Sequence, residues 1–93
     1  MRSFKPEDKL SRTEKMLSTD LDQETVLMSI EAGAYYGMAG TARTIWAKLE
    51  TPMTFAALVD ELVKQYAVTP EACAAELQGF LGEMEKEGLL HVG

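Results

Sequence analysis

The stretch that decides the fold is Gly33-Ala34-Tyr35-Tyr36-Gly37-Met38. It follows an apolar and β-branched run from Thr25 to Ile30, and a glycine turn at 31–33 separates the two segments. Two such segments joined by a short glycine-containing turn are typical of a β-hairpin. Helical spacing begins directly after Met38, so the second strand leads straight into a helix. We therefore expect residues 34–38 to form a strand whose open edge can bind another chain.

A further strand is expected before the hairpin, at Lys15 to Thr19, which completes a three-stranded antiparallel meander. The segment 20–24 holds two aspartates, whose side chains can bond their own backbone in a turn. Because side chains alternate between the two faces of a strand, Tyr36 and Met38 share one side while Tyr35 and Gly37 share the other. At most one of the two tyrosines is then buried, and an exposed aromatic side chain at a sheet edge favours a binding role.

Three helices follow the sheet. The first opens at Gly40-Thr41 and ends at Glu50-Thr51-Pro52. The second begins at Thr54 as N-cap, and the third runs from Pro70 to about Glu87, with Thr69 as its capping residue and Gly88 as a left-handed terminator. Leu89 to Val92 can form a short extended return. The apolar stripes of the helices are Ala42, Ile45, Trp46 and Leu49; Phe55, Leu58, Val59, Leu62 and Tyr66; and Cys73, Leu77, Phe80, Leu81 and Met84.

This order predicts an α+β, winged-helix-like fold in which a three-stranded antiparallel sheet precedes three helices. The first fifteen residues are polar and show no period, which is typical of a flexible arm. Residues 16–93 then form one domain, because a chain of 93 residues is too short for two independent cores.

Composition excludes several classes of function. The chain has no apolar window long enough to span a membrane and no signal peptide, so we expect a cytoplasmic protein without a membrane partner. It has one cysteine, Cys73, and one histidine, His91. No catalytic triad, thiolate metal site or glycine-rich phosphate loop can be assembled from these residues. We expect no enzymatic activity, no cofactor and no metal; Cys73 is expected to be a small buried residue.

Charge argues against nucleic acid as a partner. The net charge is −6, and affinity for nucleic acid depends on clustered basic residues. The third helix would be the recognition helix of a winged-helix DNA-binding regulator, which is the main alternative function. It carries a single lysine, Lys86, against five glutamates: Glu71, Glu76, Glu83, Glu85 and Glu87.

A distributed motif resembles the PqqD family. It comprises Gly33-x-Tyr35-Tyr36-Gly37-Met38, Ile45-Trp46-x-x-Leu49, Thr54-x-x-x-Leu58-Val59 and Leu81-x-x-Met84-x-x-x-Gly88-Leu89-Leu90. The resemblance extends from about Met16 to Val92. Ala39 and Ala42 depart from it, since many relatives have Asn after the strand and Gly before the apolar stripe of the first helix. The members of this family are small peptide-recognition proteins of ribosomal-peptide modification pathways.

The resemblance implies a binding mechanism and a site. In the family, an extended leader segment of a precursor peptide adds as a strand to the third strand and lies in the groove between that strand and the third helix. The implied binding residues are Ala34, Tyr35, Tyr36, Gly37 and Met38 on the strand, and Glu76, Leu77, Phe80, Leu81 and Met84 on the helix. Helical spacing alone favours core packing over a groove for Leu77, Leu81 and Met84; with the resemblance the two roles stand level, because one stripe can serve both.

The resemblance further implies partners. A lasso-peptide pathway is favoured, in which the protein delivers the leader to a separate leader peptidase and serves a cyclase or another modifying enzyme. A PqqD-type chaperone of cofactor biosynthesis is a second alternative. A homodimer stays open, because an unpaired edge strand can pair with another copy of the chain.

Overall fold

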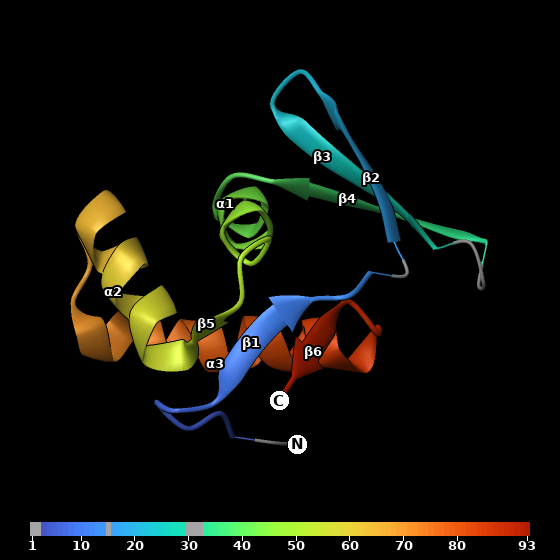
Figure 1. Ribbon diagram of the computed structural model, residues 1–93. Coiled ribbons are helices and arrows are strands. Elements are labelled where there is room, and N and C mark those ends of the chain that lie inside the picture. Colours follow the sequence, from blue (N-terminus) through green and yellow to red (C-terminus); the bar gives the residue numbers. More distant parts are fainter. Residues whose placement is uncertain (1–2, 15, 30–32) are drawn as a thin grey trace.

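The computed structural model describes residues 3–14, 16–29 and 33–93, and in these residues two small sheets are arranged around three helices (Figure 1). The α+β, winged-helix-like fold is confirmed. The strands are β1 (Lys9–Arg12), β2 (Met16–Leu21), β3 (Glu24–Ser29), β4 (Ala34–Ala39), β5 (Met53–Thr54) and β6 (Leu90–Val92). The helices are α1 (Thr41–Lys48), α2 (Phe55–Gln65) and α3 (Pro70–Lys86).

The predicted meander is the sheet β2-β3-β4, in which both pairs of neighbours are antiparallel. The turn between β2 and β3 is reduced to Asp22-Gln23, and Asp22 adopts a left-handed φ of 56°. Asp20 therefore belongs to β2 and not to the turn. Lys15 and Ile30, which were expected at the ends of two strands, lie outside the described residues.

The prediction of a flexible arm at residues 1–15 is wrong for the described part of that segment. β1 is the central strand of a second sheet with the order β5-β1-β6. Leu10 is completely buried, and Phe4 is buried with its ring stacked on Phe55 at a centroid distance of 6.3 Å. The amide side chain of Gln78 bonds both backbone groups of Phe4, accepting from its N–H at 2.7 Å and donating to its carbonyl at 2.7 Å. The N-terminal segment is thus part of the folded domain.

The helix ends follow from local sequence. Thr54 and Thr69 accept hydrogen bonds from Ala57 and Ala72, which satisfies backbone N–H groups in the first turns of α2 and α3. Gly88 has a φ of 77°, as expected for a glycine after the end of a helix. α1 begins after Gly40 without a side-chain cap.

One core joins the two sheets and the helices. It takes in Leu10 of β1, Leu27 of β3 and the predicted helical stripes, with Ile45, Trp46 and Leu49 buried as expected. Within this arrangement, α1 lies between the β2-β3-β4 sheet and the α2–α3 layer (Figure 1).

Among the described residues, no helix has the length and apolar character needed to cross a membrane.

Candidate functional site

The first part of the candidate site is the free edge of β4. Within the described residues, β4 pairs with β3 alone, so its other side has no strand neighbour. Alternate residues of an edge strand direct their N–H and C=O groups outward. The edge includes all five strand residues predicted from the sequence, Ala34 to Met38. It can therefore accept a further antiparallel strand.

The two tyrosines of β4 lie on opposite faces, as predicted. Tyr35 is 72% exposed, whereas Tyr36 is half-buried and its hydroxyl group donates to Glu87 Oε2 at 3.3 Å. Desolvation and, to a lesser extent, the charge of Glu87 raise the pKa of Tyr36. The hydrogen bond connects β4 to the C-terminal end of α3, so the strand and the third helix are held together at this end.

Gly37 has a local role that the sequence did not reveal. A Cβ atom at this position would lie 2.5 Å from Glu24 Oε1 on the neighbouring strand. The missing side chain therefore leaves room for the Glu24 carboxylate over the sheet. That the absence of a side chain at Gly37 also lets a peptide backbone approach closely is still a prediction.

The second part of the site is an apolar cleft of about 420 Å³ between the start of α1, the end of α2 and α3. Three predicted helix residues, Glu76, Leu77 and Phe80, contribute to its wall. The other lining residues are Thr41, Ala42, Ile45, Leu62, Tyr66, Val68, Ala72 and Cys73. β4 ends at Ala39 and the cleft begins two residues later at Thr41, so edge and cleft are adjacent along the chain.

Few polar side chains line the cleft. The Tyr66 and Thr44 hydroxyl groups lie 2.9 Å apart and share a hydrogen bond. Cys73 is buried as expected, and desolvation, assisted by the charge of Glu76, raises the pKa of its thiol. The cleft therefore favours apolar side chains, with the exposed carboxylate of Glu76 at its rim.

Leu81, Met84 and Met38 are placed differently from the rest of the predicted set. All three are buried in the core, Leu81 completely so. They are not among the residues that line the cleft. Their direct contact with a peptide stays a prediction.

Sequence reasoning did not identify the part of the cleft wall formed by α1 and by the end of α2. Ala42, Ile45 and Tyr66 were assigned to the core stripes of those helices, and Ile45 is indeed buried. The signal that could have identified the opening is Ala42. Its small side chain is the first of the α1 stripe, ahead of the bulkier Ile45 and Trp46, and it lines the cleft.

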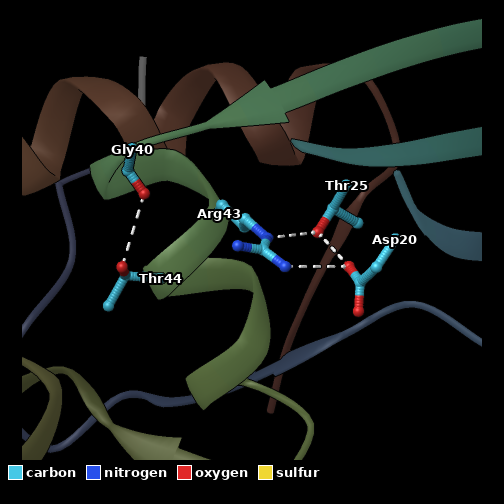
Figure 2. Close-up of polar contacts among 5 residues, drawn as sticks. All are labelled: Asp20, Thr25, Gly40, Arg43 and Thr44. Carbon is cyan, nitrogen blue, oxygen red and sulfur yellow. Dashed lines mark hydrogen bonds and ion pairs between the residues drawn. The ribbon is translucent and has the colours of Figure 1, made fainter. Parts of the chain in front are cut away.

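A polar network joins the β2-β3-β4 sheet to α1 (Figure 2). Thr25 Oγ1 donates to Asp20 Oδ1 at 2.7 Å, and Arg43 Nε donates to Thr25 Oγ1 at 3.2 Å. Arg43 Nη2 also lies 3.6 Å from Asp20 Oδ1. The hydrogen bond from Thr25 is the main cause of the lowered pKa of Asp20, to which Arg43 adds. Because α1 also lines the cleft, this network fixes the sheet relative to the cleft.

Within the described residues, no three histidine, cysteine or acidic side chains are grouped in a way that could hold a metal ion. The site combines an open strand edge with an apolar cleft that begins two residues further along the chain, a combination that suits peptide binding by strand addition.

Comparison with known proteins assigns the family. The model of Coenzyme PQQ synthesis protein D (PqqD) matches residues 24–90, which is more than half of the chain. The chain belongs to the PqqD family. No curated protein gives a significant match.

Two solved structures share the fold. TbiB1 in complex with the TbiA(beta) leader peptide is 26% identical in sequence, with a TM-score of 0.81, and the match covers 87% of this chain and 94% of that chain. A lasso peptide synthetase B1 complexed with the leader peptide is 17% identical, with a TM-score of 0.77 and coverage of 88% and 96%.

Proposed function

We propose that this protein binds the leader segment of a ribosomally made precursor peptide as an additional strand on β4. The observation that carries the proposal is the open edge of β4, from which the chain leads within two residues into the apolar cleft formed by α1, α2 and α3. Membership of the PqqD family and the likeness to TbiB1, whose structure contains a leader peptide, support the same function.

Strand addition divides the binding energy between backbone and side chains. Hydrogen bonds to the outward N–H and C=O groups of β4 provide affinity that depends little on the leader sequence. Alternate leader side chains then point toward the helical side, where the cleft can accept one or two apolar groups. Phe80 is half-buried and Glu76 exposed, so these two residues contact the guest most directly.

The partner enzymes follow from the same proposal. A protein without a catalytic constellation that holds a leader acts by presenting the precursor to other proteins. We propose a leader peptidase as the recipient, and a cyclase or other modifying enzyme as a further partner, in a lasso-peptide pathway. Since the precursor is made on ribosomes, we place this step in the cytoplasm.

The alternative of a DNA-binding regulator is not favoured. α3 would present exposed glutamates, among them Glu71, Glu76 and Glu83, to the phosphate backbone. A chaperone role in cofactor biosynthesis has support only from the description of the family model.

The test is a titration of the chain with a synthetic leader peptide from a short precursor gene identified in its gene neighbourhood. Replacing Phe80 with Ala should weaken binding by about tenfold, because a half-buried aromatic side chain at a binding site is worth more than 1 kcal/mol. Val63→Ala is the matched control: Val63 is also half-buried against the core, but it is not among the cleft residues. Equal affinities of the two variants would refute the assignment of the cleft, and no binding by the wild-type protein would refute the function.

A further inference from the structure

Gly37 leaves an open passage over the edge strand β4, and the carboxylate of Glu24 lies in this passage. Glu24 is the first residue of β3, and the direct partner of Gly37 on β3 is Val26. The Glu24 side chain therefore leans diagonally across the sheet, where its Oε1 atom lies 2.5 Å from the position that a Cβ atom at residue 37 would occupy. The carboxylate is thus displaced from its own strand toward the open edge of the sheet.

The Glu24 carboxylate has no partner within the described part of the chain. The residue is exposed, and none of the described side chains forms an ion pair or a hydrogen bond with it. Its direct neighbours in the ladder are Leu21 on β2 and Ala39 on β4, neither of which carries a charge. The carboxylate is therefore available to a group that arrives from the edge of β4.

A leader strand added to β4 would bring a side chain to this carboxylate. Adjacent strands lie about 5 Å apart, and the leader residue opposite Gly37 would point to the same face of the sheet as Glu24. Because Gly37 has no side chain, the stem of a lysine or arginine on the leader can cross β4 and place its charged group at Glu24. Tyr35 lies on the same face two residues along β4 and is 72% exposed, so its ring can cover the stem of such a side chain.

We infer that Glu24 is a specificity-determining residue of the leader-binding edge, and that it selects a leader with a lysine or arginine opposite Gly37. This inference rests on the proposed function and names the class of leader that the edge accepts. Opposite charges on neighbouring strands stabilise their pairing, whereas like charges destabilise it. Glu24 therefore disfavours a leader with an acidic residue at this position, and the net charge of −6 favours a basic leader in the same sense.

The test is a double-mutant cycle, measured by calorimetric titration with the same synthetic leader peptide. Glu24→Gln keeps the shape of the side chain and removes its charge, so it should weaken leader binding about threefold, as expected for an exposed ion pair. In a series of peptides, each lysine or arginine of the leader is replaced in turn by glutamine. For one of these peptides, Glu24→Gln should no longer change the affinity, because the partner charge is already absent.

Asp22→Asn is the matched control. Asp22 is an exposed carboxylate in the turn between β2 and β3, two residues from Glu24. The substitution removes the same charge, and asparagine tolerates the left-handed φ of 56° at this position, so leader affinity should not change. Both variants should unfold at the temperature of the wild type, because both positions are exposed.

The two proposals fail in different ways. Absence of leader binding by the wild-type protein would refute the proposed function. Leader binding that Glu24→Gln leaves unchanged, or weakens equally for every peptide of the series, would refute the role of Glu24 alone, as would binding of a leader that has no lysine or arginine. An equal loss in Asp22→Asn would also overturn it, because the net charge of the protein and not the position of the carboxylate would then control the affinity.

Discussion

Replacing Phe4 with Ala should destabilise the whole domain, although Phe4 lies in a polar segment whose composition is typical of a flexible arm. Its ring is buried to 96% by the stack on Phe55 and by the surrounding core. Removal of a fully buried phenylalanine side chain costs about 3–5 kcal/mol. The two hydrogen bonds from Gln78 go to the backbone of residue 4, so they can persist in the variant. We therefore expect a loss near the lower limit, about 3 kcal/mol.

A loss of this size is measurable in a chain of 93 residues. The melting temperature should fall by about 12–24 °C, since 1 kcal/mol corresponds to about 4–8 °C in small domains. Urea unfolding followed by the fluorescence of the single tryptophan, the buried Trp46, gives the free energy directly. Lys5→Ala is the control, because Lys5 is the neighbouring residue and is exposed. If both variants unfold within about 0.5 kcal/mol of the wild type, the N-terminal segment does not belong to the core.

Two further predictions concern titratable groups. Burial raises the pKa of the Cys73 thiol, so Ellman's reagent at about pH 8 should modify Cys73 at least tenfold more slowly in the native protein than in the urea-unfolded protein. Bound leader should slow the modification further. Equal rates in the native and unfolded protein would show that the thiol is not buried. The pKa of Asp20 is lower in the folded protein than its ordinary value of 3.8. The Asp20 carboxylate therefore stabilises the fold fully at a pH above 3.8, and this stabilisation is lost as the pH falls through the lower pKa of the folded state. The stability advantage of the wild type over Asp20→Asn, measured by thermal unfolding, should therefore shrink as the pH is lowered from about 5 to about 2.5. An advantage that stays constant over this range would contradict the network with Thr25 and Arg43.

The parts of the fold that were predictable are those with a local period. Alternation placed Tyr35 and Tyr36 on opposite faces, and helical spacing together with Thr54, Thr69 and Gly88 gave the ends of α2 and α3. These signals arise from neighbouring residues, so tertiary contacts are not needed to recognise them.

The second sheet was not predictable in the same way. β1 has four residues and β5 has two, which is too short for a period to be recognised. The pairing of Leu10 with Val92 joins opposite ends of the chain. Phe4 and Leu10 are isolated apolar residues in a polar segment, and only the packing of distant elements shows that they are buried.

The residues of the candidate site could be predicted as a set, but the sequence did not show which of them line the cleft and which are buried in the core. Periodicity indicates which face of α3 is apolar, and it correctly selected Leu77, Phe80 and Leu81 for that face. It cannot distinguish Phe80, at the wall of the cleft, from Leu81, which is completely buried. That difference depends on how α1 and the end of α2 pack against α3, which the period of α3 does not contain.

Amide hydrogen exchange, with and without a synthetic leader, tests the central claim most directly. The β2-β3-β4 sheet has two edges, so β2 is an internal control for β4. If the leader adds to β4, the outward-facing amides at alternate positions of Ala34–Ala39 should become strongly protected, while those of Met16–Leu21 should keep their free-state rates. Protection confined to β2, or unchanged exchange in β4 under saturating leader, would contradict strand addition at this edge.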